Sequence, residues 1–360
     1  MNKNSNLTLA DSICDLRSRK IKTTFFKQIN SLLDWSLIDE VIKQYYKKGN
    51  SAAGKPAYEG LLLLKACLLQ TWYGLSDYEV EDRINDSISF SYFCGMSIDQ
   101  VSPDHSTISR FRTLMTKEGA YDDLFKQIND QLEAHCIIVK TGALVDASII
   151  DSPLKPKGRP QYKVAEDREA TERSCEELAK EKEAKRLDKR VASSVDTEGA
   201  WVKKAGKLRY GYKKHHLTDE QGLILGVVTT AANLNEISNL EEVLDSAQLP
   251  EGIPIKADKG YQSKKNADLL VRRKLKNQIL KKAKKNHPLT KWEKRFNKII
   301  GQTRYKVERT FGSIIRWFRA GVARYRGIKK MHTQNLMEAI SYNLYRSPGI
   351  IMSNSIKNLK

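Results

Sequence analysis

Three acidic residues lie in unlike surroundings along this chain of 360 residues. Asp146 interrupts the apolar run 142–150, Asp258 follows the apolar segment 253–257, and Glu308 lies in a strongly basic segment. A carboxylate in an apolar strand is costly unless it is paired or metal-bound, so we expect these acids to converge on one ion. Mg²⁺ prefers hard oxygen ligands, and two such ions can clamp the attacking and leaving oxygens of an in-line displacement. The three acids therefore predict a divalent-metal site for phosphoryl transfer.

Asp151 is the alternative to Asp146 as the first ligand. Successive strand residues face opposite sides of a sheet, so the two aspartates are expected on opposite faces. Asp151 also precedes Pro153, where a turn-capping aspartate is common. We therefore favour Asp146.

The other two acids also have ordinary structural interpretations. Asp258 can cap a helix or turn before Gly260, and Glu308 can pair with Arg304 one helical turn earlier. That pairing and a ligand role can hold together. The helix of Glu308 is expected to bury four large apolar side chains, namely Val307, Phe311, Ile314 and Phe318.

The positive charge of the chain is concentrated around two of these acids. The sequence has 63 Lys and Arg against 43 Asp and Glu, and residues 256–330 hold 25 of the former and 4 of the latter. The clusters at 272–276 and 281–285 suit a polyanion, because each neutralised phosphate releases counterions. A solvated lysine surface is the alternative for any single cluster. The position of Asp258 and Glu308 within the basic segment favours DNA or RNA.

Composition and length indicate a soluble intracellular protein of two or three domains. The N-terminus lacks an apolar signal core, and the longest apolar stretch, 61–69, is interrupted by Lys65 and too short to span a bilayer. The five cysteines include no C-x-x-C pair, so neither a disulfide framework nor a zinc site is indicated. We expect a cytoplasmic, nucleoid-associated protein without membrane contact.

The first 135 residues are predicted to be helical. Pro56 opens an apolar helix that ends near Gly74, and Ser76 with Glu79 has the spacing of a capping box. Breaks at Gly74, Gly95 and Pro103 are typical of a helix-turn-helix module, although any small helical bundle has such breaks. Candidate DNA contacts in the segment 106–112 are Ser106, Thr107, Arg110 and Arg112.

The remainder is predicted to form an α+β or α/β domain. A charged insertion, 153–200, follows the strand of Asp146, then a hairpin of strands 207–217 and 222–230, a helix 236–247 and the strand that ends at Asp258. The order from 141 to 320 is strand, strand, strand, helix, strand, helix, short strand, helix, which is that of a ribonuclease H-like domain. We expect a helical DNA-binding domain at 1–135, the catalytic domain at 136–345 and a tail at 346–360.

Four ordered blocks carry a resemblance to a known family. They are 145–150 (VDASII), 207–215 (KLRYGYKKH), 257–261 (ADKGY) and 304–311 (RYKVERTF). Together they resemble bacterial insertion-sequence transposases of the DDE type, in the group named after insertion sequence five, over roughly residues 30–345. The resemblance implies that Asp146, Asp258 and Glu308 are the catalytic triad and that residues 56–115 bind DNA.

The resemblance also implies cofactors and partners. Two Mg²⁺ ions, with Mn²⁺ as an alternative, would be shared by the three acids. The partners would be the terminal inverted repeats of the element and target DNA, bound by a homodimer that holds both ends. Further candidate DNA contacts outside the helical module are Lys214, Tyr261, Lys281, Lys282, Lys284, Lys285, Arg304, Arg316 and Arg319.

Some positions depart from the family pattern. Asn235 and Glu236 stand where relatives often have His-Asp, Gly301 where they have Tyr, and Ile315 where they have Lys. Phosphate contacts would then be reassigned to Arg316 or Arg319. A nuclease of the same fold and a non-catalytic DNA-binding regulator derived from a transposase are the alternative functions.

Overall fold

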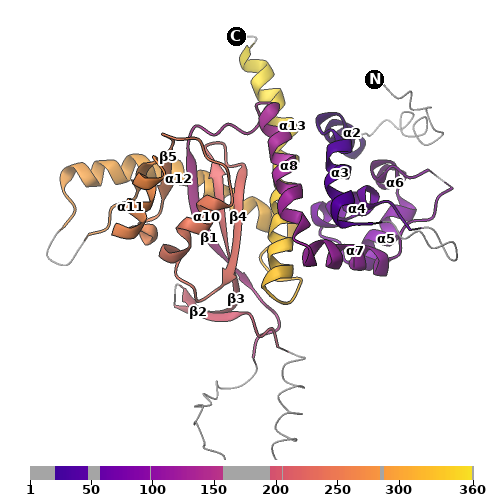
Figure 1. Ribbon diagram of the computed structural model, residues 1–360, viewed down its shortest axis with the longest axis horizontal. Coiled ribbons are helices and arrows are strands. Elements are labelled where there is room, and N and C mark those ends of the chain that lie inside the picture. The colour runs from indigo at the N-terminus through magenta and orange to yellow at the C-terminus, as the bar shows by residue number, and fades with distance from the viewer. Residues whose placement is uncertain are drawn as a thin grey trace, which may run out of the picture.

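The computed structural model describes residues 21–47, 57–97, 99–156, 195–204, 206–283 and 288–358. Most of the expected charged insertion, and both Lys284 and Lys285, lie outside these residues. A sheet occupies the middle of the molecule, with α11 and α12 on one side and the N-terminal helices on the other (Figure 1). Helices α13 and α8 lie between the sheet and those N-terminal helices.

The described N-terminal part is helical, as predicted. Its helices are α2 (Ile21–Leu32), α3 (Trp35–Tyr45), α4 (Gly60–Tyr73), α5 (Asp77–Asp86), α6 (Ile88–Cys94), α7 (His105–Lys117) and α8 (Ala120–Ala134). Every residue of α4 from 62 to 70 is buried, because this apolar helix is surrounded by others. It ends at Gly74, which adopts φ 64°, and the capping box of Ser76 and Glu79 is present.

The helix-turn-helix expectation does not describe α7. A ten-residue connection joins α6 to α7, longer than the three- or four-residue turn of that motif. A turn of the right length, which contains Gly74, joins α4 to α5 instead. Helix α5 has acidic residues at Asp77, Glu79 and Glu81, which do not suit a helix that enters a DNA groove.

A six-stranded mixed sheet forms the second part. Its strands are β1 (Ala143–Asp151), β2 (Ala200–Lys204), β3 (Lys207–Asp219), β4 (Ile224–Ala231), β5 (Pro254–Ala257) and β6 (Lys276–Ile279). The order is β2-β3-β1-β5-β6, and β4 also pairs with β3. Strand β1 is antiparallel to β3 and parallel to β5, so it lies at the centre. The predicted hairpin is β3–β4, whereas β2 was not predicted.

The other elements of this part follow the predicted order with altered bounds. They are η1 (Glu236–Asn239), α10 (Leu240–Asp245), η2 (Lys259–Tyr261), α11 (Lys264–Arg272) and α12 (Lys291–Phe318). The helix predicted at 236–247 is therefore a 3₁₀ turn followed by a short α-helix. Helices α12 and α13 pack on the face of the sheet that carries His216 and Lys214. Helix α10 packs on the opposite face, where Gly226 leaves room for Ser246.

The C-terminal segment forms a helix where a tail was expected. Helix α13 (Ile328–Asn358) runs through residues 346–358, and Ser347 and Ile350 are buried. It packs against β4 and also against α4, α7 and α8. The indole nitrogen of Trp72 in α4 donates to the carbonyl of Ser341 in α13 at 2.9 Å. Helix α13 therefore joins the sheet to the N-terminal helices.

Candidate active site

Two strand ends bring Asp146 and Asp258 together. The parallel pairing of β1 and β5 aligns Val145 with Ala257, and the two aspartates are the next residues along. Asp258 precedes η2, but its side chain makes no capping hydrogen bond, so the carboxylate has no capping role. Neighbouring parallel strands thus place both carboxylates at one edge of the sheet.

Helix α12 supplies the third acid. Its buried side chains are those predicted, namely Val307, Phe311, Ile314 and Phe318. Val307 and Phe311 pack against Leu144 of β1, which fixes the helix across the strand that carries Asp146. Glu308 follows Val307 and is 61% exposed, compared with 16% for Asp146 and 32% for Asp258. The three acids therefore line a site that is open on the side of α12.

One guanidinium contacts all three acids. Arg304 Nη2 lies 3.1 Å from Asp146 Oδ2 and 3.5 Å from Glu308 Oε1, and Nη1 lies 3.3 Å from Asp258 Oδ1. The pairing of Arg304 with Glu308 was considered from sequence, but the contacts with the two aspartates were not. Arg304 is itself only 19% exposed, so the cluster is partly shielded from water.

Asp151 does not join this cluster. It forms a two-pronged ion pair with Arg209, with Nε–Oδ1 and Nη2–Oδ2 distances of 2.7 Å. Strand alternation explains the separation, because residues five apart on β1 face opposite sides. The structure therefore gives Asp151 a separate partner and leaves Asp146 with the other two acids.

The acids fit a divalent ion by chemistry and direction. They provide an all-oxygen donor set, which Mg²⁺ prefers, and they already face a common cation. Among the residues that the structure describes, no group of three or more His, Cys, Asp or Glu side chains is arranged to hold a metal ion. The N–O distances of 3.1 to 3.5 Å around Arg304 explain this spacing, since Mg²⁺ draws oxygens to about 2.1 Å.

Three aromatic or imidazole side chains support the acids from inside. His216 is paired across the strands with Asp146 and stacks on Phe311 at 4.6 Å. Burial holds the pKa of His216 well below its usual value, so the ring is neutral. Tyr261 is fully buried with its hydroxyl 3.5 Å from His215 Nδ1, and burial raises its pKa well above the usual value. Sequence reasoning gave the histidines no role.

Three of the expected DNA contacts are buried and correct the sequence interpretation. Tyr261 has no exposed surface. Lys214 is also fully buried, with its ammonium 2.8 Å from Glu338 of α13. Arg112 is buried against Asp77, with Nη1 and Nη2 bonded to its two carboxylate oxygens at 2.9 and 2.8 Å. These side chains hold elements together and present no surface to a phosphate.

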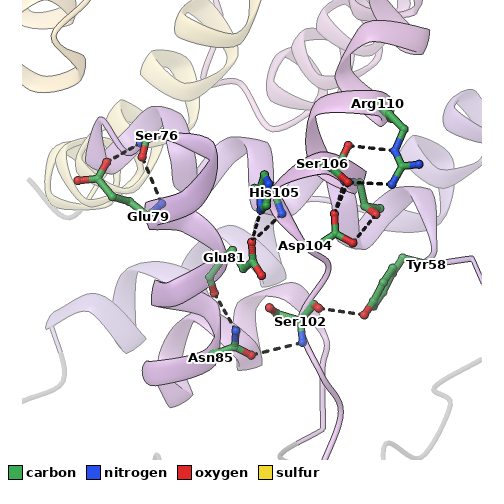
Figure 2. Close-up of polar contacts among 11 residues, drawn as sticks. Tyr58, Ser76, Glu79, Glu81, Asn85, Ser102, Asp104, His105, Ser106 and Arg110 are labelled. Carbon is green, nitrogen blue, oxygen red and sulfur yellow. Dashed lines mark hydrogen bonds and ion pairs between the residues drawn. The ribbon is translucent and has the colours of Figure 1, made fainter. Parts of the chain in front are cut away.

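The polar residues at the start of α7 form a local network (Figure 2). Asp104 caps the helix and accepts hydrogen bonds from the hydroxyls of Ser106 and Thr107. Arg110 is exposed, and its guanidinium bonds to the carbonyl and the hydroxyl of Ser106. The first role of Ser106 and Thr107 is thus to stabilise the helix end, while Arg110 lies at the surface.

A neighbouring feature of this module was missed from sequence. His105 bonds to Glu81 at 2.8 Å and stacks on Tyr78, which is 65% exposed, with ring centroids 3.9 Å apart. The stacked pair joins the starts of α5 and α7. No motif in the sequence links these residues, because the contact depends on how the two helices pack.

A basic cavity lies just beyond η2, the turn that follows Asp258. It has a volume of about 670 Å³ and is lined by residues that include Ser263, Lys264, Lys281 and Lys282. Asn297 of α12 fixes the backbone of Lys281 by two hydrogen bonds of 2.8 and 2.9 Å. The cavity therefore has a framed wall with lysines around it. Of the other expected contacts, Arg316 and Arg319 are exposed at the C-terminal end of α12.

Comparison with known families identifies two matching segments. Residues 15–114 match the family described as "Transposase domain (DUF772)", and residues 139–344 match the "Transposase DDE domain". The chain is also similar to the "Transposase for insertion sequence element IS1106" of Neisseria meningitidis serogroup B. That similarity is 32% identity over 240 residues, covering 66% of this chain and 76% of the relative.

One solved structure resembles the chain weakly. It is the cryo-EM structure of a piggyBac transposase synaptic complex with hairpin DNA, with a TM-score of 0.41 and 12% identity. The alignment covers 95% of this chain and 77% of the other, but a likeness at this level supports no argument. Separately, none of the helices in the described residues has the length and apolar character needed to cross a membrane.

Proposed function

Because the chain belongs to the DDE transposases of insertion sequences, we propose that it binds the terminal inverted repeats of its element and catalyses metal-dependent strand cleavage and strand transfer. The observation that supports this proposal is the convergence of Asp146, Asp258 and Glu308 on one cation, from two strand ends and a helix. The narrower assignment to the group of insertion sequence five stays a prediction. The mixed sheet and the order of its elements support a ribonuclease H-like fold.

Asp146, Asp258 and Glu308 would hold the divalent ions, which when bound would activate the attacking oxygen and stabilise the leaving oxygen. The protein's own contribution is positioning. Parallel pairing of β1 and β5 fixes the two aspartates beside each other, and the packing of Val307 on Leu144 fixes the glutamate opposite them. The partly open side at Glu308 leaves room for a DNA backbone to approach.

The lysines around the basic cavity would bind the DNA backbone. Lys264, Lys281 and Lys282 line that cavity, and side chains of this kind neutralise phosphates without reading sequence. Exposed Arg110 on α7 is our candidate for base recognition, since arginine can bond to guanine in the major groove. Lys284 and Lys285 stay in the prediction although they lie outside the described residues. We also expect two copies to act together on the two ends.

A cleavage and joining assay tests the proposal. The substrate is a labelled oligonucleotide from the end of the flanking DNA that carries an inverted repeat, and a supercoiled plasmid serves as the target. We expect cleavage and insertion with Mg²⁺ or Mn²⁺ and neither with excess chelator. Cleavage without insertion would indicate a nuclease. Specific binding without cleavage in either metal would indicate a non-catalytic regulator.

A further inference from the structure

The guanidinium of Arg304 has a particular environment. Its two terminal nitrogens contact three carboxylates, while its Nε is buried and has no hydrogen-bond partner within the protein. A guanidinium keeps its proton at any pH the folded protein experiences, so this positive charge is permanent. Arg304 can therefore leave the acids only by moving, never by becoming neutral.

The charge balance explains why an arginine is needed there. Asp146, Asp258 and Glu308 come from separate elements, and three nearby carboxylates repel one another when no cation lies between them. One guanidinium compensates for a single negative charge and leaves the cluster with a net charge of about −2 when all three are ionised. The cluster is held together and remains attractive to a divalent cation.

Spacing determines what happens when such a cation arrives. The carboxylate oxygens lie 3.1 to 3.5 Å from the guanidinium nitrogens, whereas Mg²⁺ holds oxygens at about 2.1 Å. An ion drawn that close to the same oxygens would also lie beside the guanidinium, and two like charges repel at that range. The oxygens can thus serve Arg304 or the metal fully, but not both.

We propose that Arg304 is a built-in counter-ion that keeps the three acids assembled before metal binds and that the metal displaces. The inference rests on the proposed function, because it takes the acids as the metal ligands. The displaced guanidinium is then free to pair with a phosphate, for which its planar fork is well suited. DNA and metal should therefore each strengthen binding of the other, as coupling between two sites is reciprocal.

Manganese binding tests the proposal without measuring activity. We would titrate Mn²⁺ into wild-type protein and two variants and follow free Mn²⁺ by electron paramagnetic resonance. Arg304→Gln removes the competing guanidinium. Arg309→Gln is the matched control, since it removes one positive charge from the same helix, and Arg309 is bonded to the carbonyl of Gln221 at 3.2 Å. A further variant, Arg304→Lys, keeps the charge but lacks the fork that reaches three carboxylates.

We expect Arg304→Gln to bind Mn²⁺ about tenfold more tightly than Arg309→Gln, because the ion pairs no longer compete. In chelator, Arg304→Gln should melt at a lower temperature than Arg309→Gln, and Mn²⁺ should restore more of its stability. Arg304→Lys should lie between Arg304→Gln and wild type in both measurements. Addition of inverted-repeat DNA should tighten Mn²⁺ binding in wild type but not in Arg304→Gln.

Two results would overturn the proposal. Equal Mn²⁺ affinity in Arg304→Gln and Arg309→Gln would show that Arg304 does not compete with metal. Weaker binding in Arg304→Gln would show that Arg304 organises the ligands instead. Failure of the proposed function gives a different result, namely wild-type protein that binds no Mn²⁺ and still cleaves DNA in chelator.

Discussion

Replacing Lys214 by Met should destabilise the protein strongly. The ammonium of Lys214 lies 2.8 Å from Glu338 and 3.3 Å from the carbonyl of Ala320. Lys214 has no exposed surface, and Glu338 is 4% exposed. Methionine fills a similar volume but leaves the carboxylate of Glu338 buried with only the amide of Gln334, 2.8 Å away, as its partner.

The magnitude follows from this burial. Breaking a buried ion pair by removing one partner costs about 3–5 kcal/mol, because the remaining charge is uncompensated. Removing both charges is much less costly, since the desolvation of both ions is then avoided. The double variant Lys214→Met with Glu338→Gln should therefore recover most of the loss, and its amide oxygen can still accept from Gln334.

Urea denaturation of wild type, both single variants and the double variant measures the coupling directly. The outcome that refutes our reasoning is a loss of less than about 1 kcal/mol in Lys214→Met, below the range for a broken buried pair. Weaker DNA binding at unchanged stability would instead restore the sequence-based prediction that Lys214 contacts DNA. The structure predicts the reverse, a stability change that accounts for any change in binding.

Three further predictions concern stability and DNA binding. Burial raises the pKa of Asp219 to about 6, so the folded state holds this proton more tightly than the unfolded state and stability should fall as pH rises from about 4 to 6; Asp219→Asn should flatten that slope in melting curves. Burial lowers the pKa of Lys65 to about 8, so Lys65→Met should stabilise the protein by about 1–3 kcal/mol at pH 7 and remove a rise in stability between pH 8 and 10; a destabilised variant at pH 7 contradicts this. Neutralising Lys281 and Lys282 should weaken binding to all DNA alike and flatten its salt dependence by about 0.9 for each phosphate that the protein no longer neutralises, whereas Arg110→Ala should reduce the preference for inverted repeats over random DNA in competition assays; the opposite pattern would reverse these roles.

The positions of the acids were predictable because their signals are local. An aspartate within an apolar run marks a strand that must still accommodate a charge, and Asp146 and Asp258 both follow this pattern. The helix of Glu308 was predictable in its buried face, since Val307, Phe311 and Ile314 recur at helical spacing. These patterns need no knowledge of distant partners.

Partners of basic residues were not predictable in this way. Lys214 pairs with Glu338, which is 124 residues away, and Arg112 pairs with Asp77, which is 35 residues away. A basic side chain in a basic protein is interpreted from sequence as a polyanion contact unless its acidic partner is known. The same limit hid the contacts of Arg304 beyond its own helix, because they depend on the pairing of β1 and β5.

The long C-terminal helix was missed for a related reason. Its Pro348 and Gly349 indicate an end of regular structure, yet α13 continues through both. Ser347 and Ile350 on either side are buried, so tertiary packing overrides the local preference. The proposed domain boundary near residue 345 therefore falls within a helix.

Comparison of Asp146→Asn with Asp151→Asn tests the central claim most directly. Both substitutions remove one negative charge from β1, but Asp146 faces Arg304 with the other two acids and Asp151 pairs with Arg209. The measurement is Mg²⁺-dependent cleavage of a labelled inverted-repeat end, with binding to the same DNA measured in parallel. We predict that Asp146→Asn binds the DNA but does not cleave it, and that Asp151→Asn does both. Cleavage by Asp146→Asn and its loss in Asp151→Asn would contradict the assignment of the active site.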